Sequence, residues 1–493
     1  MIELASAGGA APEKTYGRPR PTSLPYLDLN MYRRNTDVVA RVDDIGHVLR
    51  LQMMAIRERR FLFTNQGDII EVTDPLRPAM FRRKAYPRGH IQLAFNRKLG
   101  KWILIVCAGV PGTSPSKQNP LGKYGDPALI ERCLKHPGLR GVRIYDATDP
   151  VDVRLLAEWS CDQGDAKRAV QTGGGGADAY YDGGRYLYLQ ASPGESFTVL
   201  ESPWRYYTYG LQILDIADPA QPRFVANWWM PGQRAEEQAE ACQWPEYGDR
   251  QSTNHLLGSL CMRGRVEDGE RYAYSCWGSF GLLVHDLSDI RRPRLVGRYS
   301  PRTAPGAIPF HTVDVLNLTR GFVITSPEPL YPDGAEPFHP SCIIDVRDAA
   351  NPREIARLPV PVPPPDAPFS DFLDRRGRFG PHNPPYINSP GKANPDFTCY
   401  AYFNAGMQMF DITDPEKPVI SGYFIPPQTG SYDEPDSHCR DVDAVFVEWD
   451  RNLIWVCSLT GMYLIVTPKL GVPTLRPMQV GEWTQPGLND GHP

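Results

Sequence analysis

The chain has 493 residues, of which 41% are hydrophobic, and its formal net charge at pH 7 is −4. This hydrophobic content is enough for a buried core, while the slight negative charge offers no basic surface for nucleic acid. No apolar run approaches the roughly 20 residues that span a bilayer. The first 23 residues also lack the positive charge and apolar segment of a signal peptide. We therefore predict a cytoplasmic protein with neither a nucleic-acid nor a membrane partner.

Residues 1–36 are rich in Pro, Gly and charged residues, which is typical of an arm that wraps around a domain or stays mobile. Residues 37–43 then read DVVARVD. This run resembles the second half of a repeat found further along the chain, but it has no first half of its own.

From residue 67 onwards one pattern recurs six times. It consists of an alternating apolar run that ends in an acidic residue, a turn of the type Asp-Pro-x-x-Pro, and a second apolar run. The copies are GDIIEVTDPLRPAMFRRKAY (67–86), GVRIYDATDPVDVRLLAEW (141–159), GLQILDIADPAQPRFVANW (210–228), GLLVHDLSDIRRPRLVGRY (281–299), SCIIDVRDAANPREIARL (341–358) and GMQMFDITDPEKPVISGYF (406–424). Because alternation with a period of two is typical of strands and Asp and Pro favour turns, each copy predicts a β-hairpin. The Asp residues are thus expected to form turns rather than to act as catalytic acids.

The spacing of the copies predicts an all-β fold, a seven-bladed β-propeller with long inserted loops. The expected blades are 48–87, 88–162, 168–232, 251–303, 308–363, 377–427 and 436–469, the last completed by residues 37–43. Closure by this N-terminal strand would leave no exposed sheet edge. The predicted domain is 37–469, followed by a C-terminal tail at 470–493.

The blades are longer than four short strands require, so the surplus must lie in inserted loops. Loops of this length on a propeller commonly gather on one face, where they can cover the central channel. They therefore favour a small-molecule substrate. The alternative is that they only decorate the surface or form a homo-oligomer.

In most of the predicted blades a histidine stands at nearly the same position, ahead of the blade's second strand. These histidines are His47, His90, His255, His311, His382 and His438. The remaining blade has Thr172 followed by Gly173–Gly176. Because the innermost strands line the channel of a propeller, residues at one phase of successive blades should form a ring around its axis.

Two interpretations of this ring remain open. Each imidazole could simply bond to a neighbouring blade as part of the repeat. Alternatively, because neutral imidazole is the commonest metal ligand, the ring could hold a metal. For that case we predict His255, His311, His382 and His438, which lie on consecutive blades, as ligands of Fe(II), with Cu, Zn and Mn as alternatives.

Other residues near the predicted axis could support chemistry at such a metal. His90, Arg440 and Tyr180 are candidate proton donors or anion clamps. Asp314 and Asp441 each stand three residues after a histidine and are expected to brace the site rather than to bind the metal.

The hairpin pattern resembles that of the LVIVD-repeat proteins, as GLQILDIADPAQP and GMQMFDITDPEKP show, and the resemblance covers about residues 37–467. It implies a β-propeller and no particular activity. The arrangement of the histidines, but not their local motifs, is similar to that of the propeller dioxygenases that cleave carotenoids and stilbenes with iron held by four histidines. Methanethiol oxidases of the selenium-binding family also build a His-based metal site on a propeller.

The sequence thus predicts a metal-dependent enzyme that acts on a small apolar or aromatic substrate. Oxygenation or oxidative cleavage is the first choice of reaction, and a metal-dependent lyase or hydratase is the next. The alternative is a non-catalytic propeller, a scaffold or binding protein, in which the histidine ring is structural.

Overall fold

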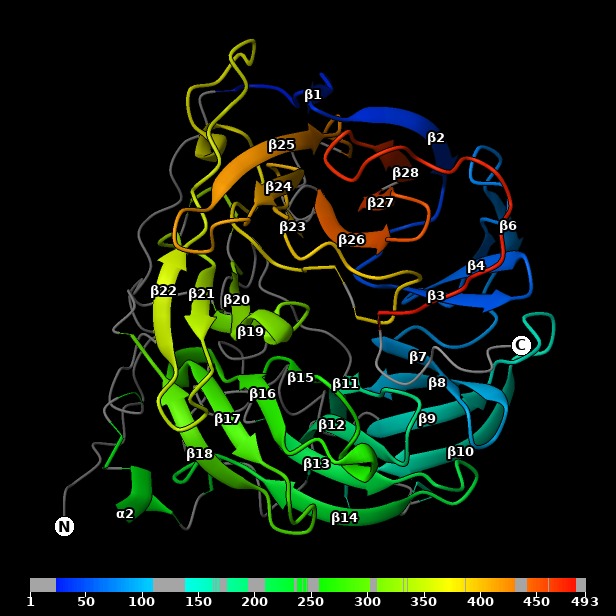
Figure 1. Cartoon of the computed structure of the whole chain (residues 1–493), viewed down its shortest axis with the longest axis vertical. Coiled ribbons are helices and arrows are strands. Elements are labelled where there is room, and N and C mark those ends of the chain that lie inside the picture. The colour runs from blue at the N-terminus through cyan, green and yellow to red at the C-terminus, as the bar shows by residue number, and fades with distance from the viewer. Residues whose placement is uncertain are drawn as a thin grey trace.

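The computed structural model is an all-β propeller of seven four-stranded antiparallel sheets, arranged as blades around a central axis (Figure 1). It describes residues 24–109, 138–162, 164, 166–167, 175–193, 209–234, 237–241, 243–244, 246, 257–301, 308–330, 332–334, 336–385, 387–430, 441–459 and 461–484. The prediction of a seven-bladed propeller is confirmed.

The first five blades follow the chain without interruption, each from its inner to its outer strand. Blade one contains β3 (Leu51–Ile56), β4 (Arg59–Thr64), β5 (Ile69–Glu71) and β6 (Ala79–Arg82). Blade two contains β7 (Ile91–Asn96), β8 (Lys101–Ala108), β9 (Gly141–Asp146) and β10 (Arg154–Ser160). Blade three contains β11 (Gly175–Tyr180), β12 (Tyr186–Ser192), β13 (Gly210–Asp215) and β14 (Arg223–Trp228). Blade four contains β15 (Leu260–Met262), β16 (Tyr272–Cys276), β17 (Leu282–Asp286) and β18 (Arg294–Tyr299). Blade five contains β19 (Ile308–Asp314), β20 (Phe322–Glu328), β21 (Cys342–Asp345) and β22 (Arg353–Arg357).

The last two blades each take their outer strand from the N-terminal part of the chain. Blade six contains β23 (Phe397–Ala401), β24 (Met407–Asp411), β25 (Val419–Ile425) and β1 (Tyr32–Arg34); blade seven contains β26 (Val442–Glu448), β27 (Leu453–Ser458), β28 (Gly461–Val466) and β2 (Asp37–Asp43). In Figure 1 the blue strands β1 and β2 lie beside orange β25 and red β28. The predicted closure by residues 37–43 is confirmed, since Asp37 pairs with Val466 and Asp43 with Gly461. The repeat pattern did not predict β1.

Helices are short and few in the described part of the chain: α2 (Gln238–Ala241) and the 3-10 turns η3 (Val266–Asp268), η4 (Gly278–Phe280), η5 (Leu318–Arg320) and η6 (Phe372–Asp374). None of them is long and apolar enough to span a bilayer.

The repeated Asp residues form the turns that the sequence predicts. In six of the hairpins the side chain of the Asp that opens the turn accepts a hydrogen bond from the backbone N–H two residues further on. These residues are Asp74, Asp149, Asp218, Asp289, Asp348 and Asp414.

Apolar side chains from neighbouring blades pack together to form the core. The largest cluster joins blades seven, one and two and includes Trp455, Phe61 and Trp102, each almost completely buried. Burial of apolar area on this scale is the main stabilising term of the fold, since each Å² removed from water contributes about 25 cal/mol.

Blade six lacks the inner strand that the other blades have. Its place is taken by residues 379–385, where His382 N donates to Ala401 O (2.9 Å) and Ala401 N donates to Asn383 O (3.0 Å). Three prolines within this stretch, Pro381, Pro384 and Pro385, have no N–H to donate, so a full ladder with β23 cannot form. His382 is thus held on an irregular segment rather than on a strand.

After His382 this segment crosses the channel. Asn388 Nδ2 donates to the carbonyl of Leu93 on β7 (3.2 Å) and to that of Tyr181, just after β11 (3.4 Å). Next to this point Thr484, from the C-terminal part of the chain, donates its backbone N–H to the carbonyl of Ser389 (2.9 Å) and accepts from Ser389 N through its hydroxyl (3.0 Å). The segment therefore forms a floor across the channel, which we call the channel floor.

Candidate metal centre on the propeller axis

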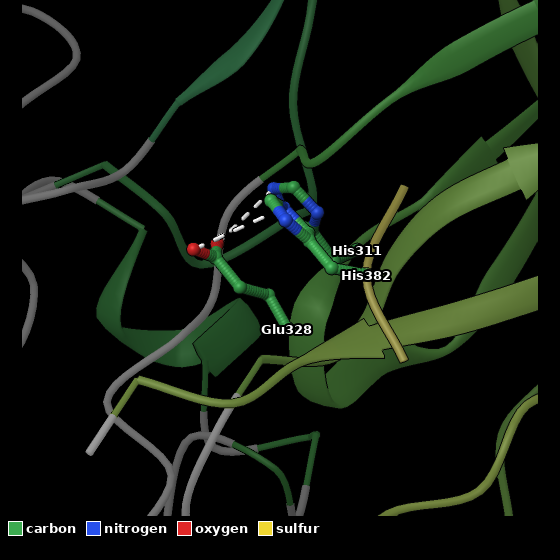
Figure 2. Close-up of side chains that lie close together, drawn as sticks. All are labelled: His311, Glu328 and His382. Carbon is green, nitrogen blue, oxygen red and sulfur yellow. Dashed lines mark ion pairs between the residues drawn. The ribbon is translucent and has the colours of Figure 1, made fainter. Parts of the chain in front are cut away.

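Two histidines and one carboxylate converge at the axis on the side where the inner strands begin. His311 lies on β19, Glu328 ends β20, and His382 lies on the segment that replaces the inner strand of blade six. Figure 2 shows the two imidazole rings side by side, with the Glu328 carboxylate facing their edges. One potential ligand atom from each of the three residues lies within 4.8 Å of the other two.

The two Nε2 atoms face different oxygens of the same carboxylate. His311 Nε2 is 3.4 Å from Glu328 Oε2, and His382 Nε2 is 3.9 Å from Glu328 Oε1. The ring centroids of the two histidines are 5.0 Å apart. Two imidazoles and one carboxylate are the donor set of the facial triad that binds Fe(II) with open positions.

Asp443 on β26 holds the other nitrogen of His382. The imidazole Nδ1 donates to Asp443 Oδ1, while Asp443 Oδ2 lies 3.1 Å from His47 Nε2. The amide of Asn383 donates to the backbone carbonyl of Asp443 (2.6 Å). A carboxylate in this position fixes the tautomer of a metal-binding histidine and leaves its Nε2 lone pair available.

The charge states of the cluster suit cation binding. Burial alone would raise the pKa of Glu328, but His382, His311 and Arg378 outweigh that effect and lower it to about 2. Burial lowers the pKa of His311 to about 4, although Glu328 opposes this shift. At neutral pH the carboxylate is therefore ionised and the His311 imidazole is neutral, which is the form that binds metals.

Arg378 and Phe403 complete the surroundings of the cluster. Arg378 Nη1 is 3.1 Å from Glu328 Oε1, and its guanidinium lies over the ring of Phe403. That ring stacks on His382 with an interplanar angle of 15°. The cluster is thus fixed on several sides before any ligand is bound.

His90, a predicted catalytic residue, stands at the start of β7 on the same side of the channel. Its Nδ1 lies 3.8 Å from Asp178 Oδ1, and Arg50 binds both oxygens of that carboxylate at 2.7 Å. Burial would raise the pKa of Asp178, but Arg50 and His90 together hold it well below its usual range. The side chain of His90 is 37% exposed, so its other nitrogen can reach a ligand in the channel.

The other predicted site residues lie elsewhere or outside the described chain. His255, His438 and Arg440 fall on residues that the structure does not describe. Tyr180 lines the channel below the cluster, and its hydroxyl donates to the carbonyl of Met262 (3.2 Å). Burial raises the pKa of Tyr180 well above its usual value, so this phenol is a poor acid.

The carboxylates expected to brace the site have other partners. Asp314 accepts a hydrogen bond from the backbone of Leu316 (2.9 Å), and Asp441 accepts one from Gln428 (3.0 Å). Among the described residues, the bracing role belongs to Asp443, two positions after Asp441. Asp441 precedes β26, and Asp443 lies at a break in the pairing register between Val442 and Ala444, so simple alternation along the strand could not have identified Asp443.

Sequence reasoning also missed Glu328, which no repeat pattern marks. The second strands of the other blades end in small residues or Cys: Thr64, Ala108, Ser192, Cys276, Ala401 and Ser458. These ends are not in register with one another, since Glu328 is six residues beyond the partner of Asp345 but Ala108 is five beyond the partner of Asp146, so no repeat position marked Glu328 in the sequence.

Comparisons with known proteins identify no family for the chain. No family model and no curated protein matches the chain. The solved structures similar to it include Raptor from Chaetomium thermophilum (10% identity, TM-score 0.44, 89% of this chain and 30% of that one). They also include the β-propeller domain of Cps50 (Swd1) from Myceliophteria thermophila (9% identity, TM-score 0.46, 88% of this chain and 99% of that one). A third is the designed protein Ika8 (9% identity, TM-score 0.41, 90% of this chain and 100% of that one). The resemblance to LVIVD-repeat proteins therefore stays a prediction.

Proposed function

We propose that this propeller is a metal-dependent enzyme whose divalent cation, Fe(II) in the first place, is bound by His311, His382 and Glu328. The observation that carries the proposal is the convergence of two imidazole Nε2 atoms on one ionised carboxylate at the channel axis. Cu, Zn and Mn are the alternative metals, since imidazole and carboxylate donors also suit them.

The free atoms of the cluster support this proposal. With Asp443 on its Nδ1, His382 has only Nε2 left to offer, and Glu328 Oε2 is not used by Arg378. His311 Nδ1 is buried and has no hydrogen-bond partner within the described ranges, so no neighbour fixes the tautomer of His311 and its Nε2, which faces Glu328, is free to be the unprotonated nitrogen. A neutral imidazole binds a metal through its unprotonated nitrogen.

Such a cation would supply Lewis acidity or redox chemistry to a small substrate bound at the axis. In this proposal His90, oriented by Asp178, accepts or donates the proton that the reaction requires. The cluster geometry supports oxygenation and a lyase or hydratase reaction equally. The apolar or aromatic character of the substrate rests on the sequence alone, because the ring of Phe403 is completely buried and contacts His382 and Arg378.

Elemental analysis of the protein purified without chelator tests the proposal. We expect about one Fe, Cu, Zn or Mn per chain, and its loss in His311→Ala, His382→Ala and Glu328→Gln. Glu354→Gln is the matched control, because Glu354 pairs with Arg357 on the outer strand β22 and should not affect metal content. A wild-type protein that contains no metal and takes up no added Fe(II) would overturn the proposal.

A second candidate is a non-catalytic propeller that binds a partner and uses the same cluster only for stability. It is favoured by the ion pairs that the cluster makes without any metal: Arg378 with Glu328, and His47 and His382 with Asp443. These contacts join blades one, five, six and seven. In this case a chelator would leave the melting temperature unchanged, whereas bound metal would make the melting temperature fall when it is removed.

A further inference from the structure

A small cavity, whose lining includes several polar side chains, lies in the channel between the cluster and the channel floor. It is lined by inner-strand residues of blades one to five and by the floor segment: Arg50, Gln52, Gln92, Asp178, Ala179, Tyr180, Ser259, Leu260, Cys261, Thr312, Val313, Asp314, Pro384, Pro385, Ile387 and Asn388. Gln92 comes two residues after His90, and Asp314 three after His311. At roughly 3.3 Å per residue these two lining residues lie about 7–10 Å deeper in the channel than the histidines, while Thr312, next to His311, lines the near end of the cavity.

The cavity is in contact with the residues that hold the cluster. Thr312 follows His311 in β19, and its hydroxyl donates to the backbone carbonyl of His382 (2.8 Å). Asp178, which also lines the cavity, pairs with His90. Whatever occupies the cavity therefore lies directly behind the histidines on the floor side.

Two buried amides in the cavity wall have unused polar atoms. Gln52 is completely buried; its Oε1 accepts from the backbone N–H of Leu93 (3.4 Å), while its Nε2 has no partner within the part of the chain that the structure describes. Asn388 is 3% exposed; its Nδ2 donates to the backbone carbonyls of Leu93 and Tyr181, and its Oδ1 has no hydrogen-bond partner among the described residues. One free donor and one free acceptor thus face a common space.

Unpaired buried amides are costly, and native proteins usually satisfy them with ordered water. The cavity volume open to water-sized molecules is about 40 Å³. Since each buried water needs at least about 10–15 Å³ on this measure, the space can hold about three waters.

We infer that the cavity is a hydrated chamber holding a short chain of ordered waters between Gln52 and Asn388. Water, rather than an apolar gas such as dioxygen, is then the small reactant that reaches the cluster from the floor side. The supply of water to the cluster rests on the proposed metal-dependent function. If that function holds, a supply of water favours the hydratase or lyase reaction over oxygenation. Asp314 also borders the chamber; burial raises its pKa to about 7, and the chamber waters would connect its carboxyl group to the channel.

Crystals of the full chain at high resolution, native and under xenon pressure, test the inference. We expect two or three water peaks within hydrogen-bond distance of Gln52 Nε2 and Asn388 Oδ1, and no xenon peak. Dry apolar cavities bind xenon, so xenon reports access for an apolar gas. A xenon peak in the native chamber, or a chamber without water, would overturn the inference.

The variant Gln52→Met removes the free donor at nearly constant volume. We expect it to lose at least one water and to admit xenon, whereas Gln212→Met should leave the chamber unchanged. Gln212 is an equally buried amide, but it bonds to Trp159 and Cys161 away from the chamber. Xenon in the native chamber of a protein that binds metal would refute this inference alone, whereas a hydrated chamber in a protein unable to bind metal would refute the proposed function alone.

Discussion

Asp443 and His382 form a buried pair in which the carboxylate fixes the imidazole from behind, so that Nε2 faces Glu328. Both side chains are almost completely enclosed, with exposures of 1% and 7%. Burial would raise the pKa of Asp443, but His382 and His47 together hold it well below its usual range. The carboxylate is therefore ionised at neutral pH, and it anchors the cluster to blade seven.

Asp443→Asn should weaken metal binding without abolishing it. The amide can still accept from His382 Nδ1, but it carries no charge, so the basicity of the imidazole falls. Loss of such a supporting carboxylate typically costs about 10–100-fold in metal affinity. Competition against a chelator with Zn(II) or Co(II) measures the change.

Asp286→Asn is the control for that experiment. Asp286 is buried to the same extent and pairs with Arg271 and Arg294, but it ends β17, the third strand of blade four, away from the axis. Its substitution should lower stability and leave the metal affinity unchanged. Equal affinities for the wild-type and Asp443→Asn proteins would show that Asp443 does not support a metal ligand.

Asp314→Asn should stabilise the protein at alkaline pH. Burial raises the folded-state pKa of Asp314 from 3.8 to about 7, against opposing hydrogen bonds from Leu316 and Thr398. A raised pKa means that the folded state holds the proton more tightly, so this contribution to stability is complete below about pH 4 and is lost as the pH rises through 7. At pH 8 the variant should therefore be more stable by a few kcal/mol, at most about 4.

Urea unfolding at pH 4 and pH 8 checks this prediction, since the gain should be close to zero at pH 4. Asp345→Asn is a control of opposite sign. Hydrogen bonds from Arg347 and Arg353 lower the pKa of Asp345 well below its usual value, so its substitution should destabilise the protein at pH 8. If Asp314→Asn also destabilised at pH 8, the buried carboxyl would be ionised and compensated in the folded protein.

The seven blades could be predicted because each hairpin is specified locally. Alternation sets the strands, and the Asp and Pro residues set the turns, so six copies of one pattern determine the number and order of six blades. Closure by β2 was predictable for the same reason, since DVVARVD is itself half a copy.

The site is specified by departures from the repeat, and this is why the sequence predicted it only in part. The histidine register placed His311 and His382 at the axis, where the structure brings them together. Glu328 and Asp443 lie at positions that the repeat pattern does not mark, so no periodic signal identified them. Their positions depend on how blades five, six and seven pack, which is a tertiary property.

The same holds for the channel floor. A run containing three prolines could be excluded as a strand, but its path across the channel depends on Asn388 reaching Leu93, which lies 295 residues away in the sequence. Contacts over such separations follow from the closed ring and not from local preference.

Glu448→Gln should destabilise the junction between blades seven and one by about 3–5 kcal/mol, the usual result of removing one partner of a buried ion pair. Glu448 is completely buried and binds Arg60 (2.7 Å), Arg451 (2.7 Å) and the indole of Trp455 (2.6 Å). The substitution keeps the shape of the side chain but leaves two buried guanidinium groups without that charge. The free energy of unfolding in urea measures the loss.

Glu71→Gln provides the comparison, because Glu71 also binds an arginine through two hydrogen bonds, with Arg59 at 3.1 Å, but at the surface. The side chain of Arg59 is 51% exposed, so water and salt screen the pair and its loss should cost less than about 1 kcal/mol. Similar losses for the two variants would mean that Glu448 is not needed to close the ring. A much larger loss for Glu448→Gln would show that the junction completed by β2 depends on this buried charge as well as on strand pairing.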